Sequence, residues 1–397
     1  MRIIFHEMKK IWNWKILGII ALVCALFYVM FMSYFIKYYK SGNHPQAELI
    51  YYAEELSRLY GTSLTPEELS DYIASERQKL IAKAEGYIKT MPIFAESGIY
   101  SYADYGVLKD ARGREFTQAE NNAYWALYGE GCDYLGFFLE TLEHMEEEFD
   151  ITPMYIGWND SFWGILNEWE QARYIQMVQN NEHHFVLSYW THSNTNDYAS
   201  YFAVMLMLAV LILVSPLLVF DRSRYIHHLQ YSSKTGRKIM RKQLAATLLS
   251  AFILTTLLLL IFGGIYSIND TYLFWDANIN SGLNLGNYSV FNMTYGQWVT
   301  AIIALMYVLA LGFSMLAFVM ARFSRNMITL IMKLIFLFTA AAYLCAAIFN
   351  YSFSMLYNTL YQILREPGAE AYVSGFVLLL GLVPAVFVTQ MEKRADV

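Results

Sequence analysis

The chain has 397 residues, of which 56% are hydrophobic and only 16% are charged. A soluble domain carries about 25% charged residues, so this composition argues against a soluble protein and favours a chain that spends much of its length in lipid. Aromatic residues make up 17% of the chain, an excess that is typical of the aromatic belts at the two membrane surfaces.

Residues 1–15 are predicted to form a cytoplasmic helix in the membrane interface. Basic residues alternate there with apolar residues at helical spacing, namely Ile4, Phe5, Met8, Ile11 and Trp12. This pattern is typical of an amphipathic interfacial helix, although an ordinary basic flank is the alternative. Residues 16–36 follow as the first predicted span, because this apolar run is too long for a signal peptide and no small-residue cleavage site follows it.

Residues 41–198 are predicted to form an extracellular helical domain. This segment has 26 acidic and 9 basic residues, a net charge of −17. Cys132 is its only cysteine, so no disulfide can form within it. His183, His184 and His192 offer metal-ligating groups, but an exposed polar stretch is the preferred interpretation, and no metal is expected.

Helix starts inside this segment are marked by local capping signals. Thr65 with Glu68, and Thr117 with Glu120, each form a capping box, and Pro66 occupies the first helical position after Thr65. Apolar faces at helical spacing predict further helices near residues 135–145 and 162–169, and no strand-like alternation of any length occurs.

Five further apolar runs predict spans two to six. With the first, they reach the roughly 20 residues that a helix needs to cross a bilayer, and they cover residues 199–220, 244–267, 298–321, 327–350 and 372–391. Pro216 and Pro384 are expected to kink two of these spans, and Lys333 to extend along its helix toward the inner surface. Residues 392–397 are left as a cytoplasmic tail. The fold class is therefore an all-α, polytopic membrane protein.

Orientation follows from the lysine and arginine residues that flank the spans. Residues 1–15, residues 221–243 and the turn with Arg322 and Arg325 are basic, which places them in the cytoplasm. Both termini are then cytoplasmic and residues 41–198 lie outside, although Lys37 and Lys40 oppose this orientation weakly.

Several enzyme motifs are missing from the sequence. The chain has no GxxxxGK[ST] phosphate-binding loop, and His6-Glu7 is not completed to a HExxH zinc motif. No acidic residue lies deep in a predicted span, whereas ion-coupled carriers usually need ionisable groups there. We therefore expect no catalytic residue, no cofactor, no metal and no nucleic-acid partner.

The cytoplasmic loop 221–243, between spans two and three, combines basic charge with aromatic residues. A loop that only sets topology needs the charge, whereas a loop that docks on a soluble protein needs apolar anchors as well. The candidate docking residues are Arg224, Tyr225, Leu229, Tyr231, Lys234, Gly236, Arg237 and Lys238.

The run Leu229-Gln230-Tyr231-Ser232-Ser233-Lys234-Thr235-Gly236-Arg237-Lys238 resembles the coupling loop of bacterial ABC exporter permeases of the second type. The amino-terminal inner helix and the six-span layout are similar as well. The resemblance covers the membrane parts only, because the form of the outer domain varies in that family. It implies a loop that sits in a groove of a separate cytoplasmic ATPase subunit, and a second permease chain that completes the pathway.

The sequence therefore predicts a permease subunit of an ATP-binding-cassette exporter in the bacterial plasma membrane. The substrate and the choice between homodimer and heterodimer stay open. A membrane receptor that reads a ligand with the acidic segment is the alternative, and an integral-membrane enzyme or a secondary carrier is less favoured.

Overall fold

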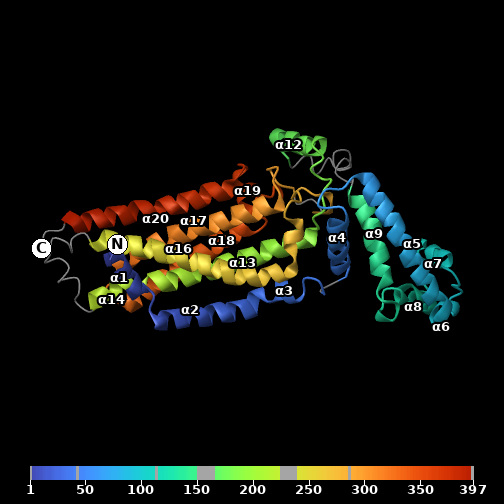
Figure 1. The fold of residues 1–397 in the computed structure, drawn as a ribbon, viewed down its shortest axis with the longest axis horizontal. Coiled ribbons are helices and arrows are strands. Elements are labelled where there is room, and N and C mark those ends of the chain that lie inside the picture. The colour runs from blue at the N-terminus through green and yellow to red at the C-terminus, as the bar shows by residue number, and fades with distance from the viewer. Residues whose placement is uncertain are drawn as a thin grey trace. The chain divides into compact units, whose positions relative to one another are not determined.

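A computed structural model describes residues 2–41, 44–111, 115–149, 166–223, 239–284 and 288–394. Within these ranges every regular element is a helix, and the β-type contacts are two isolated bridges. The predicted all-α fold class is thus confirmed for the part of the chain that is described. The chain divides into two compact units, drawn together in Figure 1.

The first, here called the membrane unit, consists of Met1–Tyr39, Ser193–Tyr272 and Asn287–Val397. It contains six helices that are long and apolar enough to cross a membrane, which indicates a multi-pass membrane protein. They are α2 with a π-helical turn, η1 (Trp14–Phe27, Tyr28–Met32), α13 with α14 (Tyr189–Val214, Pro216–Ser223), α16 with η4 (Ile239–Tyr266, Ser267–Asn269), α17 (Tyr295–Arg322), α18 (Met327–Phe349) and α20 (Ala369–Arg394).

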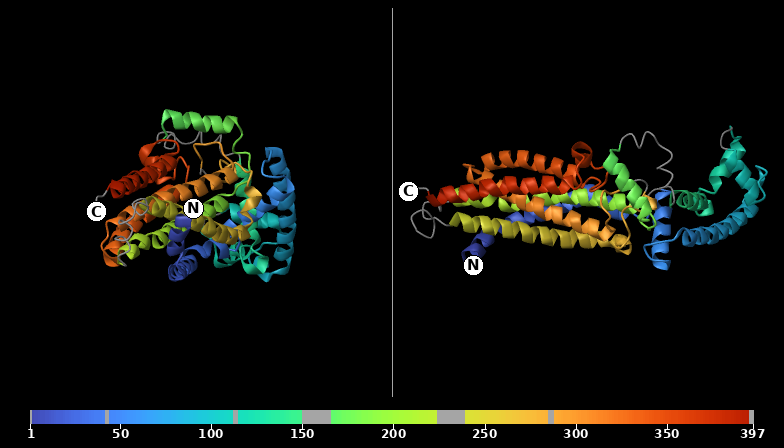
Figure 2. Two further views of the ribbon diagram at one scale, coloured as in Figure 1. Left: turned by 60° about the vertical axis from the view of Figure 1, so that its left-hand side comes forward. Right: turned by 90° about the horizontal axis from the view of Figure 1, so that it is seen from above.

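The described part of this unit also contains three short helices. They are α1 (Arg2–Ile11), α3 (Tyr34–Lys37) and α19 (Thr359–Leu364). Helix α1 and the last residues of α20 lie at the same end of the unit in every view (Figures 1 and 2), as an even number of spans requires.

Helices α17 and α20 form the closest helix pair of the membrane unit. A Cβ atom placed on Gly381 would lie 2.5 Å from the carbonyl oxygen of Gly312, and a Cβ on Gly312 would lie 3.1 Å from the backbone of Leu378. Glycine is therefore required at this crossing, where the two backbones meet without side chains between them.

Pro216 interrupts its helix, whereas Pro384 does not, and Lys333 extends its side chain along its helix. Helix α13 ends at Val214 and α14 begins at Pro216, so the helix is interrupted at the position of the predicted kink. Pro384 lies inside the continuous helix α20. The Nζ atom of Lys333 donates a hydrogen bond to the carbonyl oxygen of Phe323, at 2.9 Å, so its side chain reaches back past the start of α18 to the C-cap residue of α17.

The second unit consists of Lys40–His192 and Leu273–Gly286. Its main helices are α4 (Gln46–Leu59), α5 (Pro66–Thr90), α9 (Leu135–Phe149) and α12 (Glu168–Gln179). Shorter ones are α6 (Pro92–Ala95), α7 (Tyr102–Asp110), α8 (Gln118–Ala126), η2 (Glu130–Cys132) and η6 (Gly282–Asn284), while η5 (Thr271–Phe274) crosses the boundary. Both predicted capping boxes are present, at Thr65 and Thr117.

The segment 273–286 joins the second unit although it lies between two spans in the sequence. The backbone N–H of Gly282 donates to the carbonyl oxygen of His183 at 2.9 Å, and the Ser281 hydroxyl donates to the carbonyl oxygen of Phe185 at 2.5 Å. The sequence showed this segment only as a connection, so its membership of the second unit is a finding of the structure.

Candidate functional site

All eight predicted docking residues fall within residues 224–238, outside the described part of the chain: Arg224, Tyr225, Leu229, Tyr231, Lys234, Gly236, Arg237 and Lys238. The two ends of this loop are described, because α14 runs to Ser223 and α16 begins at Ile239. The candidate site is therefore taken as the base of the loop, where these two helices meet α1.

A polar network joins α1 to both ends of the loop. The Nζ atom of Lys10 lies 2.8 Å from a carboxylate oxygen of Glu7 and 3.1 Å from one of Asp221, the first residue of the loop 221–243. The side-chain amide of Gln243, in the first turns of α16, donates to Glu7 at 3.1 Å and to Asp221 at 2.8 Å. One lysine and one glutamine thus hold together three helices that are far apart in the sequence.

Burial strengthens the electrostatic interactions within this network. The side chains of Glu7 and Asp221 are 4% and 8% exposed, and that of Lys10 is 37% exposed. Burial alone would lower the pKa of Lys10, but its hydrogen bond to Glu7 and the charge of Asp221 outweigh this, and the pKa is raised overall. Lys10 therefore stays protonated at neutral pH, which balances one of the two buried carboxylates.

Arg222 connects the same end of the loop to a third span. Its guanidinium group donates to the carbonyl oxygen of Ser324 at 2.6 Å and to that of Arg322 at 2.8 Å. These carbonyls lie at the carboxyl end of α17, where helices leave their last acceptors without a partner. Arg222 thus caps α17 and ties it to the end of α14.

A further contact fixes α1 along α16. The indole N–H of Trp12 donates to the Ser250 hydroxyl at 3.0 Å. Phe5 of α1 is 67% exposed, whereas Glu7 of the same helix is buried. The predicted amphipathic helix is therefore present, and its face toward the spans is anchored by Glu7 and Lys10 as well as by Ile11, which is buried.

Sequence reasoning missed this network. Glu7 lies in a basic segment, and Asp221 is the only acidic residue among residues 221–243. The available signal was the position of these residues, since a lone acid beside a basic cluster often marks an ion pair. Their partnership across more than 200 positions in the sequence had no local signature.

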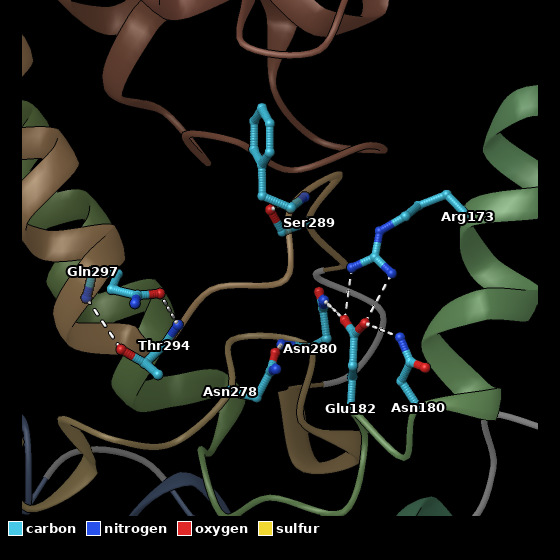
Figure 3. A network of polar contacts seen from close by, with 9 residues as sticks. Arg173, Asn180, Glu182, Asn278, Asn280, Ser289, Thr294 and Gln297 are labelled. Carbon is cyan, nitrogen blue, oxygen red and sulfur yellow. Dashed lines mark hydrogen bonds and ion pairs between the residues drawn. The ribbon is translucent and has the colours of Figure 1, made fainter.

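The second unit contains a separate buried ion pair, shown in Figure 3. The Arg173 guanidinium, on α12, donates to both carboxylate oxygens of Glu182, at 2.9 and 2.6 Å. Their side chains are 9% and 2% exposed. The Asn280 amide adds a hydrogen bond to Glu182 at 2.7 Å, from the segment 273–286. Glu182 thus joins α12 and the turn that follows it to the segment 273–286, which is a structural role.

The histidines of the second unit differ from the expectation. His183 and His192 are each only 2% exposed, so the predicted exposed stretch is wrong for these two. They are buried where residues 182–192 return toward α13. Among the described residues, no group of three or more His, Cys, Asp or Glu side chains is placed to hold a metal ion.

No family model, no curated protein and no solved structure matches the chain. The functional argument therefore rests on the residues of this chain and on their geometry.

Proposed function

We propose that the chain is the membrane-spanning permease subunit of an ATP-binding-cassette exporter in a bacterial plasma membrane. In this proposal both termini and residues 221–243 lie in the cytoplasm. A separate ATPase subunit docks on the loop, and a second permease chain completes the pathway. The loop sequence that resembles the coupling loops of these exporters, together with the six-helix membrane unit, supports this assignment.

The observation that carries the proposal is the fixed base of the loop. Asp221 and Gln243 stand at its two ends: the Gln243 amide donates to both Asp221 and Glu7, and Lys10 donates to Asp221. A displacement of the loop therefore moves α14 and α16 together rather than bending a flexible connection. Because Arg222 also holds the end of α17, the same displacement acts on three spans. A loop that only set topology would need no such anchoring.

The test is whether an ATPase associates through the loop. The full chain is purified with an affinity tag from membranes of its own host, and the copurifying ATP hydrolysis is measured. The Leu229→Asp/Tyr231→Asp double variant should lose at least tenfold of this activity, because loss of one buried anchor typically costs about 2 kcal/mol.

The matched control is Ser232→Asp, which adds a charge of the same sign in the same loop and removes no apolar anchor. It should keep most of the copurifying activity, with insertion of all three proteins in the membrane unchanged. The proposal is wrong if the wild-type chain brings down no ATPase, or if the double variant brings down as much as the wild type.

A further inference from the structure

The membrane unit contains a small apolar cavity between α13, α16 and α17, which run beside one another (Figure 1). Its volume is about 100 Å³. Phe202 of α13 and Met306 of α17 stand on its inner walls, and both are buried, with 3% and 2% exposure. The lining surface that faces the cavity is entirely apolar. This space lies toward the end of α16 that is far from Ile239, next to Tyr266.

The polar groups at the closed end of the cavity bind one another. The Thr195 hydroxyl lies 2.7 Å from the hydroxyls of both Tyr266 and Tyr295, and Tyr266 donates to the side-chain oxygen of Asn194 at 2.8 Å. These groups are therefore satisfied without a ligand. An apolar cavity of this kind stays free of water and takes a hydrocarbon guest.

The mouth of the cavity opens between α16 and α17. Gly263 is exposed there, and a Cβ atom built on it would meet nothing within 4 Å. Leu259 and Ile303 stand beside it and are partly exposed. The neighbouring outer surface is apolar, with Leu260 69% and Ile261 54% exposed. In a membrane this surface faces lipid tails, so the medium at the mouth is hydrocarbon.

An aromatic cluster near the cavity indicates how deep in the bilayer the cavity lies. Tyr201 of α13 lies with its ring centre 5.9 Å from that of Phe31 and 5.7 Å from that of Phe35, in and after the first span. Aromatic rings of this kind gather at the level of the lipid headgroups. The cavity next to them is thus reached by the upper part of an acyl chain.

We propose that an acyl chain of a bilayer phospholipid enters between α16 and α17 and fills this cavity. The apolar mouth, the satisfied polar end and the surrounding lipid select this occupant over a polar solute. The site does not depend on the export function, because it requires only the membrane unit and a bilayer.

The test uses the full chain in nanodiscs of phosphatidylcholine that contain a trace of phosphatidylcholine with a photoreactive diazirine on one acyl chain. After irradiation, label is mapped by mass spectrometry. Surface residues of any span are labelled, so the diagnostic positions are the inner-wall residues Phe202 and Met306. The wild type should carry label there. Gly263→Trp places a large ring in the mouth and should reduce this label at least fivefold.

The matched control is Gly264→Trp, the adjacent exposed glycine, which also has open space around a Cβ atom and does not line the cavity. It should keep the inner-wall label within about twofold of the wild type. Should Gly263→Trp fail to fold, Ile303→Trp against the exposed Ala304→Trp repeats the comparison on α17. An unlabelled Phe202 and Met306 in the wild type, or equal labelling in blocked and control variants, overturns the proposal.

Discussion

The two units of the molecule are held together by different kinds of internal contact. In the membrane unit, α17 and α20 approach through Gly312 and Gly381, and charged contacts gather at the end that carries the loop. In the second unit, rings and aliphatic side chains of α5, α7 and α8 form a core, and Glu182, paired with the buried Arg173, also accepts a hydrogen bond from Asn280 of the segment 273–286.

The predicted location of the second unit outside the membrane accounts for this difference. Lipid tails are as apolar as a leucine side chain, so spans gain little from burying apolar surface and depend on close backbone contact. A unit in water gains about 25 cal/mol for each Å² of apolar surface that it buries, and it can then bear the desolvation of a paired charge. The predictions below test this contrast.

The largest effect is expected at the glycine crossing. Gly381→Leu adds a side chain where even a Cβ would lie 2.5 Å from the Gly312 carbonyl oxygen. Because backbone must move, the cost should be about 4 kcal/mol, above the usual range for overpacking. Thermal unfolding in detergent measures it. Gly375→Leu, on the same helix with open space around it, should unfold near the wild-type temperature, and similar losses in both variants would contradict the contrast.

A slightly smaller effect is expected at the buried ion pair of the second unit. Arg173→Met leaves Glu182 buried with only neutral partners, which typically costs about 3 kcal/mol. Hydrogen exchange of the full chain should show faster exchange in residues 168–192, with the spans unchanged. The control is Arg77→Met, whose partner Glu146 is 50% exposed and whose loss should cost under about 1 kcal/mol. Equal effects of the two substitutions would refute the assigned role of burial.

A substitution at the base of the loop should destabilise the protein less than Gly381→Leu or Arg173→Met. Lys10→Met removes the cation between Glu7 and Asp221, but Lys10 is partly exposed, so water enters and the cost falls to about 1–2 kcal/mol. Exchange should rise in α1 and the first turns of α16. Lys9→Met, on the exposed side of α1, is the control. Adding Asp221→Asn to Lys10→Met should restore part of the loss, and no recovery would show that the ion pair is not the cause.

The smallest effect concerns pH. The Ser101 hydroxyl and the backbone N–H of Tyr100 hold the pKa of Asp104 below its usual value. A carboxyl whose folded pKa is depressed stabilises the fold above its unfolded pKa of about 3.9 and loses that contribution as pH falls through the folded value. Acidification from pH 6 to pH 3 should therefore increase exchange in α7.

Asp104→Asn should weaken that pH dependence, while Asp110→Asn, at the other end of α7, makes the same charge change as a control. The effect is small because Asp104 is exposed and water screens its interactions. If the Asp104→Asn variant kept the pH dependence of the wild type, the capping carboxylate would not be the source of that dependence.

The features predicted well from the sequence are those with a local cause. Six apolar runs marked the six membrane helices, and Thr65 and Thr117 marked helix starts because a capping box lies within four consecutive residues. The boundaries were less accurate. Helix α13 begins at Tyr189 rather than near residue 199, since its polar first turns, with Asn194 and Thr195, carry no hydropathy signal.

The features that were missed depend on contacts between distant segments. Nothing near Glu7 points to Asp221 or Gln243, and nothing near Asn280 points to Glu182. The histidines at 183 and 192 look exposed in a polar stretch, yet segment 273–286 packs on residues 183–187. Periodicity reports which face of an element is buried, whereas partners of this kind are set only by the tertiary fold.

The second unit is built from two separate stretches of the chain, and this determines when each part is synthesised. Its last segment, Leu273–Gly286, leaves the ribosome after the 80 residues of Ser193–Tyr272, which include two spans. At about 5–20 residues per second, this is a delay of roughly 4–16 s. During that interval Glu182 lacks Asn280, and residues 183–187 lack the segment that bonds to them. The second unit can therefore complete its fold only after two further spans have been synthesised. Its folding then depends on the correct insertion of those spans.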